Sequence, residues 1–237
     1  MNMASARPRS SSFGPKAMQK HGKLIRLIHS RLSKHFGRLD WWPGETKDEI
    51  IIGAILTQNT NWSNVEKALS NLRNKGLLDL KSISFMRERS LAGLIRPSGF
   101  YNQKAKRLSS FSKYIFSNYV SLDIFFSKDT LPLRNELLSL DGIGMETADS
   151  ILLYAAEKPI FVIDAYTRRI TKRVLGLASE LDYQPLQTLI SSNIREEINT
   201  YKEFHAQFVQ LAKNNCRKVP ICPTCPLSGI CNYHAKA

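Results

Sequence analysis

Apolar residues recur at three- and four-residue steps along most of this chain, and this spacing constrains its fold more than any other feature. Residues 21–36, 48–58, 65–76 and 147–156 all show it. Such spacing puts the apolar side chains on one face of an α-helix. Alternating strand patterns are scarce, and no repeat of about 20 to 50 residues is present, which argues against a solenoid. The sequence therefore predicts an all-α protein.

Residues that favour helix starts precede three of the expected helices: Thr46 or Asp48, then Ser63, then Asp182. Two segments do not fit the helical pattern. Residues 95–102 contain Pro and Gly, and residues 158–166 are crowded with β-branched side chains. We expect both segments to be loops that carry function.

The charge balance indicates the partner. Lys and Arg exceed Asp and Glu by 14 charges, with an isoelectric point near 9.8. Such an excess attracts polyanions, and nucleic acid is the leading candidate. The sequence has no run of about 18 apolar residues, so we expect a soluble protein with no transmembrane helix.

The first part of the chain is especially basic. Residues 1–39 hold nine Lys or Arg and no acid, and residues 1–19 are also rich in Ser. We expect residues 1–19 to form a disordered basic arm that could follow DNA phosphates. An organellar transit peptide has the same composition and stays an alternative, whereas the lack of an apolar core argues against a secretory signal.

All four cysteines fall within the last 22 residues, spaced C-x5-C-x2-C-x5-C: Cys216, Cys222, Cys225 and Cys231. Four thiolates in so short a segment are typical of a [4Fe-4S] cluster or a structural zinc ion. Spacing alone does not separate iron from zinc. Two disulfides are the less favoured alternative, because nothing in the sequence indicates secretion.

A second motif lies between two apolar helical stretches. Gly142, Ile143 and Gly144 form a predicted tight turn opening onto a helix, an arrangement that aims backbone N–H groups at a phosphate. The alternative is a plain connection between helices. Twenty residues after Gly144, Asp164 stands in an apolar setting followed by four basic residues. Such a carboxylate is either a helix cap or a reacting group.

Together these residues resemble a known family. The pattern L-x-G-I-G-x-x-T-A, then V-I-D, then the four cysteines, is similar to the endonuclease III branch of the helix-hairpin-helix DNA glycosylases, from about residue 20 to 235. Residues 41–62 and 96–107 look most like the 3-methyladenine DNA glycosylases of endonuclease III type. The resemblance implies a base excision repair enzyme, a monomer acting on double-stranded DNA with damaged bases, in the cytoplasm at the nucleoid.

The resemblance also implies an architecture and a site. It predicts a six-helix lobe at residues 48–157, ending in the hairpin, and a second lobe from residues 20–47 and 158–237 that carries a [4Fe-4S] cluster. It makes Asp164 the catalytic residue, beside the sugar in a cleft between the lobes. The remaining site residues that it implies are Trp42, Pro43, Gln58 and Trp62 for the flipped base, Gly142, Ile143, Gly144 and Thr147 for DNA, and the four cysteines for the metal.

Departures from the family pattern refine the expected activity. Endonuclease III carries a lyase lysine two residues after its G-x-G, where this chain has Glu146. A carboxylate cannot form a Schiff base, so we expect a monofunctional glycosylase with the Glu146 side chain turned toward solvent or a neighbouring lysine. The first cysteine gap is one residue shorter than usual, and the role of Gln207 is open. The alternatives are a bifunctional glycosylase/lyase for oxidised pyrimidines and a non-catalytic DNA-binding module.

Overall fold

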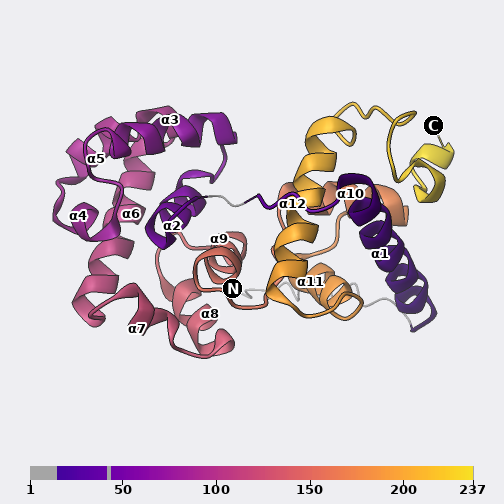
Figure 1. Cartoon of the computed structure of the whole chain (residues 1–237), viewed down its shortest axis with the longest axis horizontal. Helices are drawn as coiled ribbons and strands as arrows, with labels where there is room; N and C mark the ends of the chain where they lie inside the picture. The colour runs from indigo at the N-terminus through magenta and orange to yellow at the C-terminus, as the bar shows by residue number, and fades with distance from the viewer. Residues whose placement is uncertain (1–14, 42–43, 237) are drawn as a thin grey trace, which may run out of the picture. The chain divides into compact units, whose positions relative to one another are not determined.

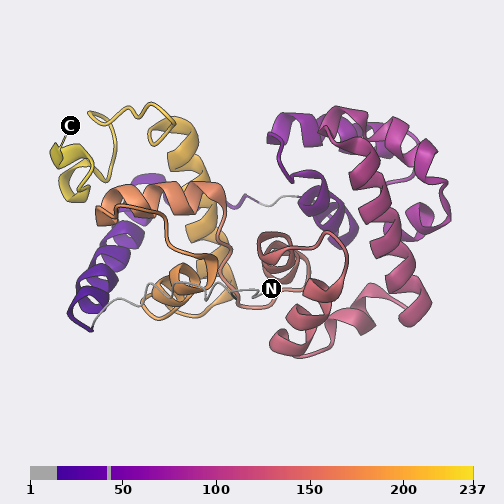
Figure 2. The same ribbon diagram turned by 180° about the vertical axis from the view of Figure 1, so that it is seen from behind.

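The computed structural model describes residues 15–41 and 44–236, and every regular element among them is helical (Figures 1 and 2). The predicted all-α fold is confirmed. The expected basic arm lies largely outside the described residues. Within the described part of the chain, no helix is long and apolar enough to cross a membrane.

The chain divides into two compact units. The first takes in Met1–Leu39, Ile163–Glu196 and Glu203–Ala237. Its helices are α1 (Pro15–Phe36), α10 (Ala165–Leu175), α11 (Tyr183–Ser191), most of α12 (Ile198–Asn214), and the short turns η3 (Ser228–Ile230) and η4 (His234–Lys236). In α1, Ile25, Ile28 and Leu32 are fully buried at three- and four-residue steps. This apolar face explains why α1 packs against α11 and α10.

The second unit comprises Asp40–Val162 and Glu197–Lys202, the start of α12. Its own elements are α2 (Lys47–Leu56), α3 (Trp62–Arg73), α4 (Leu80–Phe85), α5 (Glu88–Leu94), η1 (Arg96–Ser98), α6 (Tyr101–Asn118), α7 (Leu122–Phe126), α8 (Thr130–Ser139), α9 (Met145–Ser150) and the π-turn η2 (Ile151–Ala155). Helix α2 is central because Ile51, Ile52 and Ile55 leave no exposed surface, and it contacts α3, α6, α9 and η2.

Helix starts depend on single capping side chains. Thr46 Oγ1 accepts from the Glu49 N–H at 3.1 Å and caps α2, and Asp182 precedes α11, both as predicted. The prediction for Ser63 is wrong. Asn61 caps α3 instead, since its Oδ1 accepts from the Asn64 N–H at 3.0 Å. Asn and Ser are both favourable capping residues, and the sequence pattern pointed to Ser63, two residues too late.

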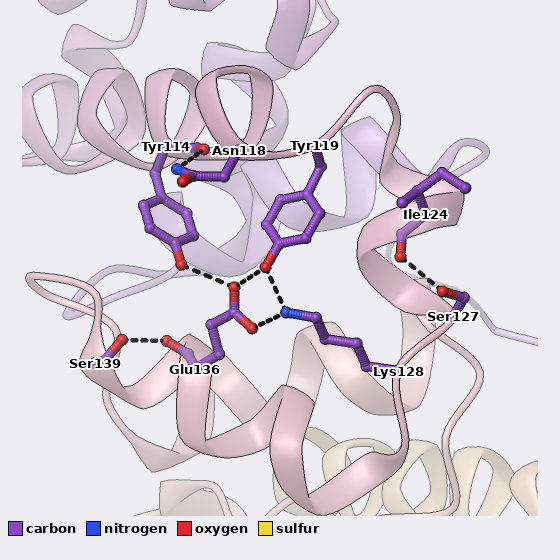
Figure 3. Close-up of polar contacts among 8 residues, drawn as sticks. All are labelled: Tyr114, Asn118, Tyr119, Ile124, Ser127, Lys128, Glu136 and Ser139. Atoms are coloured by element: carbon purple, nitrogen blue, oxygen red, sulfur yellow. Dashed lines mark hydrogen bonds and ion pairs between the residues drawn. The ribbon is translucent and has the colours of Figure 1, made fainter.

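A polar cluster fastens α8 to the end of α6 (Figure 3). The Glu136 carboxylate accepts hydrogen bonds from the Tyr114 and Tyr119 hydroxyls and pairs with Lys128. Lys128 also lies 4.6 Å from the centre of the Tyr119 ring. The bond to Glu136, aided by burial and by the negative charge nearby, raises the pKa of Tyr114 to about 12. Because α8 leads directly into the glycine turn, this cluster positions one arm of the hairpin.

Candidate active site

The glycine turn joins α8 to α9 as a hairpin. Gly142 has a φ of +75°, and a Cβ there would lie 2.3 Å from Arg107 Nε, so the turn requires glycine. The Ile143 side chain is 4% exposed, and its N–H donates to Leu140 O at 3.1 Å. Ile143 therefore anchors the turn in the core. Gly144, with a φ of −86°, precedes the first turn of α9.

Gln58 is held against this turn. It lies two residues beyond the end of α2, and its Nε2 donates to Gly142 O at 2.9 Å and to Thr147 Oγ1 at 3.0 Å. Its Oε1 accepts from Arg107 at 2.7 Å. The resemblance assigned Gln58 to the flipped base, and Gly142 and Thr147 to DNA. The structure brings these three residues together. Thr147 is 7% exposed, and its hydroxyl is the acceptor of the bond from Gln58.

A buried lysine fixes the chain just before Gln58. The Lys104 side chain is 1% exposed, and its Nζ donates to Leu56 O at 2.8 Å and to Ser98 O at 2.6 Å. These bonds satisfy a carbonyl at the end of α2 and one in the predicted loop at 95–102. Burial, together with the nearby Arg107 charge, lowers the pKa of Lys104 to about 8. One ammonium group therefore ties both segments to α6.

The same loop exposes an aromatic side chain. Phe100, just before α6, has a φ of +45° and is 65% exposed. Both features are unusual for a large apolar residue, and backbone strain of this kind clusters at functional sites. The tryptophans give a partial picture, because Trp42 and Pro43 lie outside the described residues. Trp62 is half-buried, and its ring lies 6.2 Å from that of Trp41.

Asp164 lies in the first unit, where it caps a helix and approaches a histidine. Its Oδ1 accepts from the Thr167 N–H at 2.7 Å at the start of α10. Its Oδ2 lies 3.5 Å from His205 Nε2 of α12. Burial alone would raise the pKa of Asp164, but the facing imidazole and the Thr167 amide more than offset it, so the pKa lies below the ordinary value. Asp164 is therefore ionised at neutral pH.

The cysteine loop, which holds Cys216, Cys222, Cys225 and Cys231, is attached to α10. Arg169 Nε donates to Cys216 O at 2.9 Å, and Arg173 donates to the carbonyls of Arg217 and Lys218 at 2.7 and 2.9 Å. No disulfide joins the four cysteines in this structure, and all of them line one cavity. Among the described residues, no three His, Cys, Asp or Glu side chains are arranged to hold a metal ion.

Two further residues were singled out in the sequence. The Glu146 side chain is exposed at the start of α9, as predicted. Gln207, whose role was open, is 2% exposed and donates from Nε2 to Gly37 O at 2.9 Å. It also lies near Ser33 Oγ, so it links α12 to the end of α1 and is a structural residue.

Sequence reasoning missed two side chains that hold the candidate residues in place. Arg107 lies within the block whose resemblance was noted, but nothing in its spacing indicated a bond to Gln58. His205 lies on α12, 41 positions after Asp164 in the chain. A pairing between residues so distant in sequence leaves no local pattern, so only the fold brings it to light.

A helical chain with this hairpin, with a capped and ionised aspartate and with a four-cysteine loop, has the features of a helix-hairpin-helix DNA glycosylase. Residues 52–196 match the HhH-GPD superfamily of base excision DNA repair proteins. The chain belongs to this superfamily, and the class predicted from the sequence, a DNA glycosylase, is confirmed.

Individual relatives agree with this membership. A Methanocaldococcus jannaschii protein with the provisional name of a DNA repair glycosylase is 44% identical, over 88% of this chain and 96% of its own. The crystal structure of the H. pylori 3-methyladenine DNA glycosylase bound to 1,N6-ethenoadenine is 33% identical with a TM-score of 0.70, covering 81% of this chain and 97% of that one. A trapped endonuclease III–DNA covalent intermediate has a TM-score of 0.77 at 20% identity, over 91% and 97% of the chains, and shows the shared fold.

Proposed function

We propose that this protein is a monofunctional glycosylase that removes alkylated purines such as 3-methyladenine from double-stranded DNA. The observation that carries this proposal is the state of Asp164, a carboxylate fixed by the Thr167 amide and held ionised by its surroundings. The 33% identity to a 3-methyladenine DNA glycosylase supports the substrate class. The exposed Glu146, in place of a lyase amine, supports the absence of strand cleavage.

The proposed reaction is hydrolysis of the N-glycosidic bond. The bond between C1′ and the base breaks, its electron pair leaves with the base, and C1′ becomes cation-like. The ionised Asp164 stabilises this cation, and water then adds its oxygen to C1′ and releases a proton. A 3-methylated adenine is already positively charged, so it leaves as a neutral base without a general acid.

Base recognition and DNA binding are assigned to the second unit. We assign Trp62, with Trp42 and Pro43, to the walls that stack on the flipped base, and Gln58 to the same pocket or to the gap left in the duplex. Stacking of a cationic base between aromatic faces contributes about 0.5 to 2 kcal/mol. We assign the turn at Gly142, Ile143 and Gly144, together with Thr147, to a phosphate of the DNA backbone.

We also propose that the four cysteines hold a [4Fe-4S] cluster. Four thiols around one cavity match the ligands that such a cluster takes, and Arg173 Nη1 donates to Cys216 Sγ at 3.2 Å. When bound, the cluster would crosslink the loop. Arg169 and Arg173 would then hold that loop on α10, the helix that begins after Asp164.

Product analysis tests the proposed reaction. The protein is incubated with dimethyl sulfate-treated duplex and, separately, with duplexes carrying an oxidised pyrimidine or uracil. Released bases are separated by chromatography, and strands are analysed before and after alkali. We expect free methylpurines and strand breaks only after alkali. Asp164→Asn should remove most excision and leave affinity for undamaged duplex intact.

Two outcomes would contradict the proposed function and favour one of its alternatives. A covalent adduct with lesion DNA in the presence of borohydride would restore the bifunctional alternative, because it requires a Schiff base. DNA binding without release of any base from any of these duplexes would favour the non-catalytic module.

A further inference from the structure

We propose that His205 is a positioning residue for Asp164: its imidazole holds the second carboxylate oxygen, so that Asp164 presents one fixed, ionised face to the reacting sugar. This inference rests on the proposed function for its consequence in catalysis. Its physical basis, a contact between two side chains of the first unit, does not depend on the substrate.

The two oxygens of Asp164 are held from different elements. Oδ1 accepts from the Thr167 N–H at 2.7 Å, which fixes it to the first turn of α10. Oδ2 lies 3.5 Å from His205 Nε2, which comes from α12. A carboxylate held at one oxygen alone can still rotate about its terminal bond, whose preference is broad. The approach of His205 Nε2 to the other oxygen, at the outer limit of hydrogen-bond length, narrows that freedom.

The contact is largely shielded from water. The side chain of Asp164 is 13% exposed and that of His205 is 9% exposed. Charges interact more strongly where water is scarce, so one imidazole has a large influence on the carboxylate there. This shielding also explains why burial alone would favour the protonated acid. The contact with His205 is one of the two that reverse this tendency.

Other charged groups near the pair are engaged elsewhere. On α10, Arg168 donates to Leu181 O and stacks on Tyr183, and Arg169 donates to Cys216 O. The Tyr183 hydroxyl, from α11, accepts from the Ile163 N–H at 3.3 Å.

The neighbours of His205 on α12 are engaged as well. Lys202 pairs with Glu157 at 3.2 Å, and Glu203 accepts from the Leu39 N–H at 2.8 Å. These flanking charges therefore have partners other than Asp164. The imidazole of His205 is an ionisable group that faces the carboxylate from α12.

The first test measures the carboxyl group directly. ¹³C-labelled aspartate is titrated by NMR in the full-length protein and in His205→Phe, with Asp164→Asn used to assign the signal. Phenylalanine fills similar space without a polar atom. We expect the pKa of Asp164 to rise in His205→Phe, because burial then acts without the imidazole. An unchanged pKa would overturn the proposal whether or not the protein excises any base.

The second test measures the consequence. Single-turnover release of methylpurines from dimethyl sulfate-treated duplex is followed against pH. We expect His205→Phe to lower the rate at neutral pH at least tenfold and to shift the acid limb of the profile to higher pH. Affinity for undamaged duplex and the melting temperature should stay near wild type. His205→Gln, which keeps an N–H donor, should recover part of the rate, and it serves in place of His205→Phe should that variant not fold.

The two proposals fail in different ways. If the wild-type protein releases no base, the proposed function is wrong. The NMR titration would still decide whether His205 sets the pKa of Asp164. If the wild-type protein excises bases, and both His205 variants keep its rate and its acid limb, the proposed function is supported and the proposed role of His205 is wrong.

Discussion

At the scale of single residues, the position of Gln58 depends on the absence of a side chain at Gly142. Arg107 occupies the space where a Cβ would be, and from there it donates to Gln58 Oε1. The backbone also needs the left-handed φ of +75° at this residue. Glycine thus serves the turn and the placement of the amide at the same time.

We therefore predict that Gly142→Ala destabilises the protein by about 2 kcal/mol, because left-handed alanine is strained and Arg107 must leave Gln58. Gly144→Ala is the matched control, since Gly144 has a φ of −86° and no heavy atom near its would-be Cβ. Urea unfolding of both variants measures the difference. Equal losses of stability would show that the Arg107 contact is unimportant.

At the scale of elements, the two arms of the hairpin are joined by a buried ion pair. Arg134 of α8 binds both carboxylate oxygens of Asp149 in α9, at 2.6 and 3.0 Å, and Asp149 is fully buried. Glu136, three residues from the end of the same α8, joins the cluster with Tyr114, Tyr119 and Lys128 (Figure 3). The turn is thus held by polar contacts on both of its arms.

We expect Asp149→Asn to lower the free energy of unfolding by about 3 kcal/mol, because it leaves a poorly solvated guanidinium without its charge partner. Asp123→Asn provides the same chemical change in an exposed pair, where Lys47 and Asp123 are 47% and 77% exposed. Its cost should stay below about 1 kcal/mol. Thermal unfolding followed by circular dichroism compares the two, and similar shifts would count against a structural role for the buried pair.

Sequence information predicted best where the physical cause is local. Apolar spacing predicted the helices, Thr46 was one of the two caps predicted for α2, and the two glycines indicated the turn. The cap of α3 was misplaced because Asn61 and Ser63 are chemically similar capping residues. The bond from Arg107 to Gln58 and the pair of His205 with Asp164 join residues far apart in the chain. Such contacts depend on how helices pack, so no local pattern predicts them.

At the scale of the whole molecule, the cysteine loop connects α1 with α10. Arg31 of α1 lies 3.4 Å from Pro226 O, and the Asn232 side chain donates to Val174 O at the end of α10. With the contacts of Arg169 and Arg173, these bonds attach the loop to α1 and α10 of the first unit. The second unit has no residue in this loop.

Loss of the proposed cluster should therefore loosen one unit selectively. We predict that Cys225→Ser lowers iron and acid-labile sulfide content and speeds hydrogen exchange in α10 and the adjoining part of α1. Exchange in α2 and α6 should stay unchanged. Mass spectrometry of exchanged peptides measures this, and zinc in the wild-type protein, or equal exchange in both units of the variant, would contradict the prediction.

The packing of α1 against α11 and α10 has a consequence for biosynthesis. The ribosome makes α1 well before its partner α11, which begins at residue 183, more than a hundred residues later. At synthesis rates of about 5 to 20 residues per second, the surface that covers Ile25, Ile28 and Leu32 is made on the order of ten seconds after them. The second unit, complete by residue 202, can close before the cysteines have been translated. The apolar face of α1 thus stays uncovered in the nascent chain until α10 and α11 have been made, which makes α1 a natural binding site for a chaperone.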